Sequence, residues 1–311
     1  MIISVIIPAY NSAAFIIECL NSCIRQDLSE GVFLEIIVVD DCSTDNTVEI
    51  TNAYISTTNS HNATIRLLKN QKNSGPAFSR NHGLTVCQGD YIAFIDSDDY
   101  MYPDRLSKQL KYADRTNSLV IFGGLTEVNE YNQKIRDVVR PFPVESNVFW
   151  EMLVLDELHM LTSTVLLNRK VINEIGLFDE QLIHFEDYDF FARIFKRFDP
   201  VYVPTMIAYK RVFSNSMSYT ISEDDFLSTR KIFFDLLVSR DNNLERYKRK
   251  YWSKQYFGLA RVLQGKGLVK KAAKYYWLAL NRGNVKAVLG LLLVLMPVTI
   301  QKKLAKRKWK K

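Results

Sequence analysis

The stretch that decides the fold is Tyr91–Asp99, which reads Y-I-A-F-I-D-S-D-D. Its first part, Tyr91–Ile95, is apolar and has the length of a strand that is buried on both faces of a sheet. The acids Asp96, Asp98 and Asp99 follow at once, so the strand end presents several carboxylates on one turn. Mg²⁺ and Mn²⁺ take oxygen ligands, and Mg²⁺ commonly links a protein carboxylate to a substrate's phosphates. A solvated acidic turn is the alternative, and this motif alone leaves both open.

Three more strands precede this one, and helices separate them. The predicted strands are Ile2–Ile7, Glu35–Asp40 and Ala63–Leu68, and the predicted helices are Ala13–Arg25, Asp45–Thr57 (capped by Ser43 or Asp45) and Ala77–Cys87. This alternation predicts an α/β fold with a mainly parallel, Rossmann-like sheet and helices on both faces. Ligands of such sheets bind beyond the carboxyl ends of the strands. The motifs P-A-Y-N (8–11), D-D-C-S-T-D (40–45) and D-S-D-D (96–99) lie there.

Two of the polar motifs suit a nucleotide. Asp40 and Asp41 close the second strand, where an acid can accept hydrogen bonds from a base or a ribose, although helix capping explains them equally well. Residues 73–81 place a Gly-Pro turn before a helix whose free N–H groups suit phosphate, with Arg80 one turn in. An ordinary junction between a loop and a helix is the alternative for this second motif.

Two motifs in the second half of the chain suit catalysis. Residues 186–189, E-D-Y-D, open an apolar helix and could supply a general base. Acids are also favoured in a first helical turn by the macrodipole, whatever the function. Residues 209–211, Y-K-R, followed by hydroxyl groups at 214–218, could form a lid that clamps phosphate, or simply a surface loop.

Taken together, the motifs resemble the family 2 inverting glycosyltransferases, which have the GT-A fold. The resemblance runs in order from Ile2 to about Ser218, roughly two thirds of the chain. The segments that carry it are P-A-Y-N, V-V-D-D-C-S-T-D-N-T, K-N-S-G-P-A-F-S-R-N-x-G, Y-I-A-F-I-D-S-D-D, G-L-F-D-E and E-D-Y-D-F.

The resemblance implies a role for individual residues. The residues implied to bind the nucleotide-sugar donor, a UDP-sugar, are Pro8, Ala9, Tyr10, Asn11, Asp40, Asn73, Arg80, Asp96, Ser97, Arg211 and Ser216. Asp98 is implied to bind the metal cofactor, Mn²⁺ or Mg²⁺. Asp187 is implied to be the general base, with Glu186 beside it contacting the acceptor or the sugar. The implied acceptor is a saccharide or a polyprenyl-linked saccharide, in the biosynthesis of a cell-surface polysaccharide.

These residue types fit the chemistry. Inverting glycosyl transfer is an in-line displacement in which the acceptor hydroxyl loses a proton, so one carboxylate must lie opposite the leaving group. UDP leaves with extra negative charge, which a cation and an arginine stabilise. Many relatives have R-x-H-x-x-S in the lid, but Phe213 occupies the histidine position here, so we expect water in place of that third metal ligand.

Three other functions fit the sequence less well. A sugar nucleotidyltransferase needs a Gly-rich loop and a basic residue after the first strand, and P-A-Y-N is neither. A non-catalytic homologue acting as a scaffold is expected to have lost the base or the metal acid, yet Asp98 and Asp187 are both present. Only the basic end of the chain suggests nucleic acid, and it contains no recognised module.

Composition sets the broad class. The 311 residues are 47% hydrophobic, which allows a sizeable core and excludes a disordered or disulfide-framework protein. The four cysteines form no C-x-x-C pair and the four histidines are scattered, so we expect no zinc site and a reducing compartment. The apolar start has no basic n-region, so we expect no signal peptide.

Charge is distributed unevenly along the chain. Residues 1–245 hold 22 Lys and Arg against 34 Asp and Glu, whereas residues 246–311 hold 19 Lys and Arg and no acid. The run Ala287–Ile300 is apolar, and as a helix it would measure about 21 Å, short of the ~30 Å hydrocarbon core of a membrane. We therefore expect the segment 287–311 to hold the protein on the cytoplasmic face of a membrane without crossing it. Packing of this run against preceding helices is the alternative.

The predicted domain organisation follows from these patterns. The catalytic domain is predicted over 1–225, with its nucleotide-binding part at about 1–100 and its acceptor part at about 100–225, followed by a helical region over 226–286 and the membrane-associating segment. The further predicted strands are Val120–Glu127, Thr164–Asn168 and Val201–Ala208, and the further helices are Asn147–Leu158, Asp187–Arg197, Phe226–Ser239, Leu244–Gln264 and Leu268–Arg282.

Overall fold

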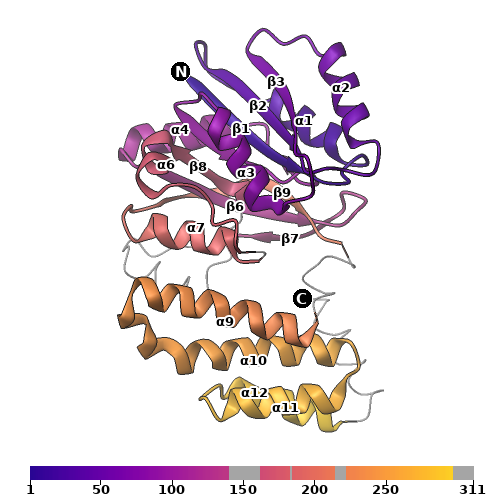
Figure 1. Ribbon diagram of the computed structural model, residues 1–311, viewed down its shortest axis with the longest axis vertical. Coiled ribbons are helices and arrows are strands. Elements are labelled where there is room, and N and C mark those ends of the chain that lie inside the picture. Colours follow the sequence, from indigo (N-terminus) through magenta and orange to yellow (C-terminus); the bar gives the residue numbers. More distant parts are fainter. Residues whose placement is uncertain (140–161, 183, 214–221, 297–311) are drawn as a thin grey trace. The chain divides into compact units, whose positions relative to one another are not determined.

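The computed structural model of the chain describes residues 1–139, 162–182, 184–213 and 222–296. These residues form two compact units, of which the first ends at Phe213 and the second begins at Ser222. The first unit is a sheet flanked by helices, and the described residues of the second are helical (Figure 1). The predicted helix 147–158 lies outside the described residues.

The first half of the sheet is parallel, as predicted. Its strands are β1 (Ile2–Ala9), β2 (Phe33–Asp40), β3 (Ala63–Lys69) and β4 (Tyr91–Phe94), in the order β3-β2-β1-β4, connected through α1 (Ile16–Ile24), α2 (Thr47–Thr57) and α3 (Gly75–Val86). Ala9 pairs with Asp40, so the motifs that follow β1 and β2 start at the same level of the sheet. Helix α2 begins two residues later than predicted, because the Asp45 carboxylate accepts the N–H of Thr47 (3.0 Å) from outside the helix.

The second half of the sheet departs from the mainly parallel prediction. Its strands are β5 (Tyr100–Met101), β6 (Val120–Val128), β7 (Lys134–Val138), β8 (Val165–Asn168) and β9 (Val201–Arg211), with the helices α4 (Arg105–Thr116), α6 (Arg169–Ile175) and α7 (Glu186–Phe195) and the short 3₁₀ helix η1 (Thr162–Thr164). Among the described strands of this half, only β6 and β9 pair in parallel, whereas β4–β8, β6–β8, β6–β7 and β5–β9 are antiparallel. The α/β class holds, but the whole sheet is mixed.

An arginine that the motifs did not single out joins the two halves. Arg105, at the start of α4, is fully buried, and its guanidinium donates to the backbone carbonyls of Phe94 (3.2 Å) and Val165 (3.0 Å). These carbonyls lie at the end of β4 and the start of β8, which pair with each other. The contact fixes the point from which the D-S-D-D loop leaves the sheet.

A cluster of short hydrogen bonds connects the starts of β1, β2 and β4, at the end of the sheet opposite to the D-S-D-D loop. Glu35 is buried and accepts hydrogen bonds from the Ser4 hydroxyl (2.6 Å) and the Gln88 backbone N–H (2.7 Å). The N–H of Gly89 donates in turn to the Ser4 hydroxyl (2.8 Å). A Cβ at Gly89 would lie 2.4 Å from the Ser4 backbone nitrogen, so only glycine fits where the chain enters β4.

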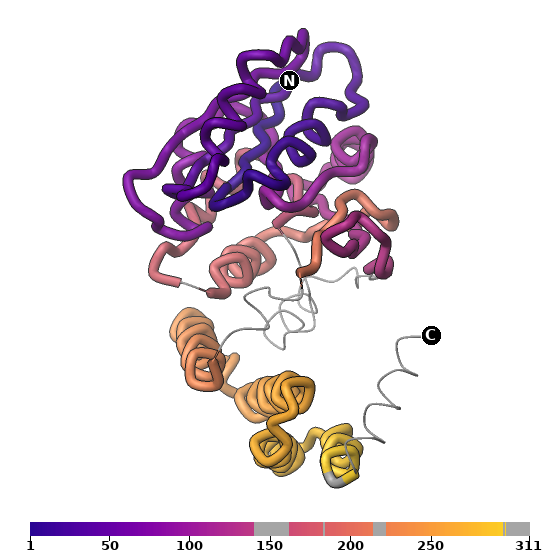
Figure 2. Tube along the Cα trace, turned by 90° about the vertical axis from the view of Figure 1, so that its right-hand side faces the viewer, coloured from indigo at the N-terminus to yellow at the C-terminus, as the bar shows by residue number. Residues whose placement is uncertain are grey.

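The second unit contains α9 (Glu223–Arg240), the 3₁₀ helix η2 (Asn242–Tyr247), α10 (Lys248–Gly265), α11 (Val269–Leu280) and α12 (Lys286–Leu295), seen nearly end-on in Figure 2. Helix α9 starts at Glu223, inside the predicted catalytic domain, because the Ser222 hydroxyl accepts the N–H of Asp225 (3.1 Å) and caps it. Residues predicted as the start of one long helix at Leu244 belong to η2. None of the helices in the described ranges combines the length and apolar character that a membrane crossing requires.

The entry into β4 gives a test of the fold. We expect Gly89→Ala to lower the free energy of unfolding by about 1–3 kcal/mol, because its methyl group would push against backbone rather than a flexible side chain. Gln88→Ala is the matched control: its side chain is exposed, and a change within about 0.5 kcal/mol is expected. Urea unfolding followed by circular dichroism measures both, and equal midpoints for the two variants would contradict the crowding.

Candidate active site

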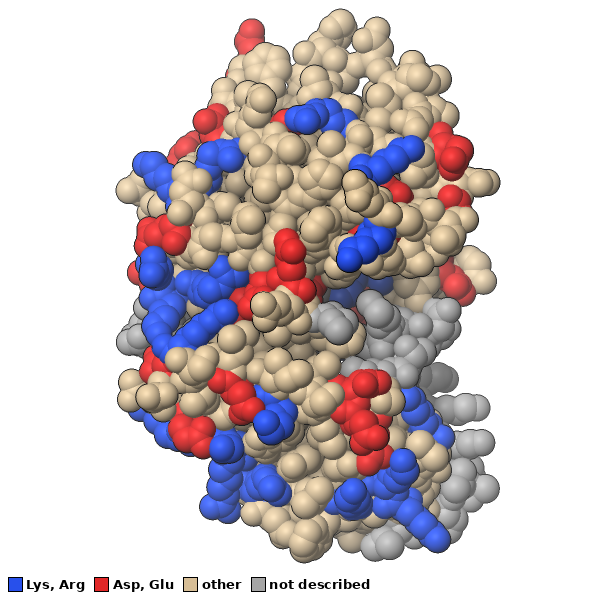
Figure 3. Space-filling view, in the orientation of Figure 1, with Lys and Arg blue, Asp and Glu red and all other residues tan. Residues whose placement is uncertain are grey.

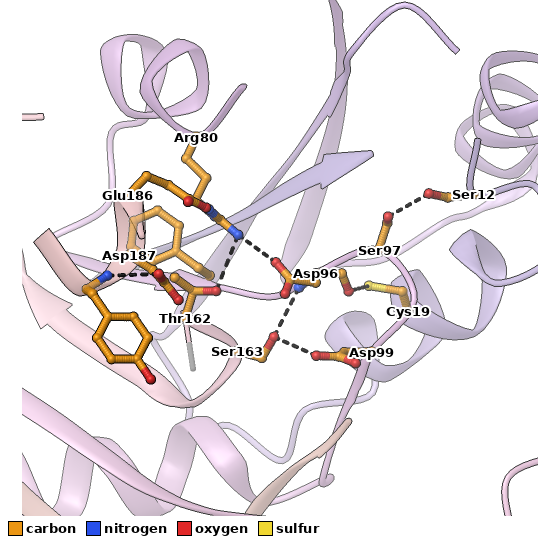
Figure 4. Close-up of polar contacts among 12 residues, drawn as sticks. Ser12, Cys19, Arg80, Asp96, Ser97, Asp99, Thr162, Ser163, Glu186 and Asp187 are labelled. Atoms are coloured by element: carbon orange, nitrogen blue, oxygen red, sulfur yellow. Dashed lines mark hydrogen bonds and ion pairs between the residues drawn. The ribbon is translucent and has the colours of Figure 1, made fainter. Parts of the chain in front are cut away.

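The D-S-D-D loop after β4 is held from three sides (Figure 4). The Ser163 hydroxyl, from η1, accepts the N–H of Asp96 (3.2 Å) and donates to Asp99 Oδ2 (2.8 Å). Ser97 Oγ lies 2.6 Å from the hydroxyl of Ser12, in the loop that follows β1. Asp99 Oδ1 accepts the backbone N–H of Arg211 (3.0 Å). Both oxygens of the buried Asp99 therefore serve the fold.

Asp98 is the acid of this loop that best fits a cation. Its pKa rises to about 6, first because burial disfavours the charged form and then because the Asp96 carboxylate lies near it. A divalent cation would offset both effects. Within the described ranges, no three His, Cys, Asp or Glu side chains converge as a complete metal cage would. A cation on Asp98 would therefore take further ligands from water and from a bound phosphate.

Arg80 connects this loop to the predicted base. It is buried on α3, and its guanidinium donates to Glu186 Oε1 (3.0 Å) and to Asp96 Oδ1 (2.9 Å). A weaker bond of 3.4 Å reaches the hydroxyl of Thr162, and the ring of Phe178 lies 5.6 Å from the guanidinium carbon. The structure thus brings Arg80, Glu186 and Asp96 together, although both of the short bonds of Arg80 go to protein carboxylates.

The acids of α7 divide into one structural carboxylate and one that suits catalysis. Asp189 is fully buried and forms an ion pair with Arg193 (3.0 Å), one turn further along the helix. Asp187 is only partly buried, and its Oδ1 accepts the N–H of Tyr188 (2.8 Å). The pKa of Asp187 rises to about 7, because of burial first and the nearby Glu186 carboxylate second, while Arg80 opposes the rise. A carboxyl group that titrates near neutrality suits a general base.

The predicted donor residues on β1 and β2 lie together. Pro8 and Ala9 end β1, and the exposed Tyr10 and Asn11 follow it. Asn11 Oδ1 accepts the N–H of Thr44 (2.8 Å), so the loops after the two strands are bonded to each other.

Asp40, at the end of β2, has one oxygen in use and one available. It is buried, and its Oδ2 accepts the N–H of Ser43 (3.1 Å). Its Oδ1 has no hydrogen-bond partner among the described residues. A buried acceptor without a partner is costly unless a ligand supplies the donor. Asp40 therefore stays a good candidate for binding the donor.

Two N–H groups at the start of α3, where the sequence suggested free donors for phosphate, are already bonded to a carboxylate. Asp41 Oδ2 accepts the N–H of Gly75 (2.7 Å), and Oδ1 accepts the N–H of Ser74 (3.0 Å). A carboxylate already neutralises this helix start, so it does not offer these two donors to a phosphate. Asn73, just before it, is exposed; its predicted contact with the donor stays a prediction.

Arg211 lies in a strand rather than in the predicted lid. It is the last residue of β9 and is buried, because β9 continues past Ala208 and pairs with β6 up to Val128. Its guanidinium donates to Glu18 Oε2 (2.5 Å), to Asn132 Oδ1 (2.7 Å) and to the backbone carbonyl of Asp98. The predicted partner Ser216 lies outside the described residues.

Aromatic rings complete the surroundings of Arg211. Its guanidinium carbon lies 4.6 Å from the centre of the Phe15 ring and 5.2 Å from that of Tyr100. Phe213, in the position where many relatives have a lid histidine, packs against Phe15 with ring centres 5.3 Å apart. This position therefore contributes apolar packing.

Several residues of the site escaped the sequence analysis. Glu18 joins α1 to both Arg211 and Asn132, which donates to Glu18 Oε1 (3.0 Å) from the turn between β6 and β7. Ser163 and Thr162 carry no motif signal at all. For Glu18, the signal is a lone acid in a helix with otherwise apolar spacing, which marks a position without revealing its partner.

Comparisons with known sequences agree with this arrangement. The chain is 31% identical over 195 residues to an uncharacterised glycosyltransferase of Haemophilus influenzae, a match that covers 63% of this chain and 72% of that protein. It is 29% identical over 244 residues to the poly(ribitol-phosphate) β-N-acetylglucosaminyltransferase TarS of Staphylococcus aureus, covering 76% of this chain. The matched part spans only 41% of TarS.

Comparisons with solved structures give the fold. S. aureus TarS 1–349 in complex with UDP-GlcNAc is similar with a TM-score of 0.58 at 20% identity, over 94% of this chain and 90% of that one. The mannosyltransferase PcManGT of Pyrobaculum calidifontis, in complex with GDP-Man and Mn²⁺, gives 0.61 at 17% identity, over 96% and 83%. The predicted GT-A fold is confirmed. Because the sequence model of Glycosyl transferase family 2 also matches residues 4–176, more than half of the chain, this protein belongs to that family and is a glycosyltransferase.

Proposed function

We propose that this glycosyltransferase transfers a sugar, with inversion, from a UDP-sugar to a hydroxyl group of a saccharide or lipid-linked saccharide. The observation that carries the proposal is the chain of contacts Glu186–Arg80–Asp96 around the buried Arg80. It connects helix α7, which carries Asp187 with its pKa of about 7, to the loop that carries Asp98. A base and a cation ligand in one rigid frame are what an in-line displacement needs.

On the acceptor side, Asp187 takes the proton of the attacking hydroxyl. With a pKa of about 7, it is ionised in a large fraction of molecules at neutral pH and still basic enough to accept a proton. Glu186 is held by Arg80, so it contributes charge and position rather than a second free base. Asp189 is tied to Arg193 inside the protein, which leaves Asp187 as the acid of this helix turn for the acceptor.

On the donor side, Asp98 fits a divalent cation, which when bound offsets the negative charge of the leaving diphosphate. The Oδ1 atom of Asp40, which is buried and has no partner among the described residues, would accept a hydrogen bond from the nucleoside. The solved complexes of TarS with UDP and UDP-GlcNAc and of PcManGT with GDP-Man and Mn²⁺ support a nucleotide sugar and a cation.

The names of two relatives give poly(ribitol-phosphate), a polymer that carries hydroxyl groups, and this supports a polymer acceptor in the synthesis of the cell-surface polysaccharide that we propose. Besides TarS, the chain is 34% identical over 129 residues to a poly(ribitol-phosphate) β-glucosyltransferase of Bacillus spizizenii, a match that covers 42% of this chain and 20% of that enzyme.

A screen of UDP-GlcNAc, UDP-glucose and GDP-mannose with Mn²⁺, measured as nucleotide release, tests the donor class. No release from any of them would overturn the proposal and favour the scaffold alternative.

The first prediction concerns the cation. We expect Asp98→Asn to lower nucleotide release at least about a hundredfold, because a catalytic metal contributes several kcal/mol to the transition state. Asp114→Asn, an exposed acid on α4, is the matched control and should leave the rate unchanged. Titration with Mn²⁺ after treatment with EDTA measures the dependence directly. Full activity in excess EDTA would remove the cation from the proposal.

The second prediction concerns the base. In the wild type, we expect kcat/KM to rise about tenfold per pH unit up to about pH 7 and then to level, because only the ionised Asp187 accepts a proton. Asp187→Asn should lose about 10²–10⁴-fold in rate together with this acid limb, while it still binds UDP in calorimetry. If Asp187→Asn keeps the wild-type rate and profile, another group is the base.

The third prediction is that Asp187→Asn stabilises the fold at high pH. The pKa of Asp187 is raised on folding, so the folded state binds this proton more tightly than the unfolded state does. Stability from this group is therefore present below about pH 4 and is lost as the pH rises towards 7. Asp187→Asn should have a higher Tm than the wild type at pH 8, and the gap should shrink towards pH 4. Equal Tm values at pH 8 would contradict the raised pKa.

A further inference from the structure

We propose that the outer face of helix α12 binds an anionic membrane surface. The helix has two apolar faces. Ala287 and Val294 point into the helical unit and are 0% and 5% exposed. A second stripe, hereafter the outer stripe, consists of exposed apolar residues at helical spacing: Val285, Val288, Leu289, Leu292 and Met296.

The inner face of α12 is fully occupied by its own unit. Gly290 lies so close to α11 that an added Cβ would be 2.3 Å from the ring of Tyr276. Tyr276 is buried in the same cluster as Ala287 and Val294. Close packing on this side fixes which residues face outwards, so the unit cannot bury the outer stripe by rotating the helix. In the described part of this run, one side packs on the helical unit, as the packing alternative expects, and the outer stripe is exposed.

The outer stripe is unusual for a surface helix in water. Leu289 and Leu292 are 58% and 52% exposed, and Val285 is 76% exposed. Lys286 is the helix's only charged residue, whereas a solvated surface helix carries polar residues on its outer face. An exposed apolar patch of this kind marks a binding surface.

Charge selects the partner. Residues 246–311 contain 19 Lys and Arg and no acid, and seven of these cations follow α12 in the sequence at 302–311. Figure 3 shows Lys and Arg side chains along the lower part of the helical unit. A second copy of this chain would bring two such cationic regions together, which Coulomb repulsion opposes. An anionic lipid surface attracts the cations and accepts the apolar side chains in its interface.

The size of the helix fits attachment without crossing. Ten residues of helix measure about 15 Å, half of the ~30 Å hydrocarbon core, so α12 would lie along the interface. Trp277, on α11, is 56% exposed, and tryptophan is a residue type enriched at membrane interfaces. Our sequence-based expectation of the cytoplasmic face stays a prediction.

The test is flotation of the full chain with vesicles. One set contains 30 mol% phosphatidylglycerol in phosphatidylcholine, and the other contains phosphatidylcholine alone. We expect binding to the anionic set only, and Leu289→Ser with Leu292→Ser should weaken it at least tenfold. Ile232→Ser is the matched control, because Ile232 on α9 is also 58% exposed and lies outside the outer stripe. Circular dichroism and release of nucleotide from the donor should be the same for all variants, which separates this proposal from the proposed function.

Four results would overturn the proposal. Equal flotation of the double variant and the Ile232→Ser control would show that the outer stripe is not involved. Equal binding to neutral vesicles would remove the role of charge. Light scattering that shows a wild-type dimer converted to monomer by the double variant, or binding to a random oligonucleotide in place of vesicles, would assign the surface to a second copy or to nucleic acid.

Discussion

The active site depends on two charged hydrogen bonds that the guanidinium of Arg80 donates, one to Glu186 and one to Asp96. The guanidinium is buried, whereas the Asp96 carboxylate is partly exposed, and the two contacts join three segments that are far apart in the sequence: helix α3, helix α7 and the loop after β4. A buried cation is stable only when its charge is paired, so the three segments must meet in one geometry for the fold to form. The pairing of one guanidinium group thus also fixes where the proposed base, Asp187, lies relative to the proposed cation ligand, Asp98.

A second regularity runs through the site: each of its acid pairs has one structural member and one with remaining capacity. Asp41 accepts the N–H groups at the start of α3, while Asp40 keeps one oxygen without a partner. Asp99 is used by Ser163 and Arg211, while burial and Asp96 raise the pKa of Asp98. Asp189 is paired with Arg193, while burial and Glu186 raise the pKa of Asp187. At each place, one acid thus stabilises the local structure and its neighbour stays available to bind a ligand.

The sequence predicted the first half of the sheet well, and the reason is local. Apolar runs such as the one in Glu35–Asp40, with the acid that ends it, belong to single strands, so the pattern along the chain reveals them. The bonds of Arg105 to two strand ends and of Glu18 to Arg211 join residues that are 11 to 193 positions apart. No local pattern encodes such pairs, and helix α4 was missed altogether. Arg211 was predicted in a lid for the same reason, because only pairing with β6 reveals that the strand continues to it.

The carboxylate of Asp41 at the start of α3 has a thermodynamic consequence. Backbone N–H groups at a helix start hold phosphate whether or not a metal ion is present, but here Ser74 and Gly75 already donate to Asp41. In the proposed reaction, side chains and a cation would then take over the part of the diphosphate's charge that these two donors do not meet. Binding of nucleotide and binding of cation become linked equilibria, each strengthening the other by the same factor. The affinity of the protein for its donor would then follow the free concentration of the cation, and loss of the ion would release nucleotide without any change in the fold.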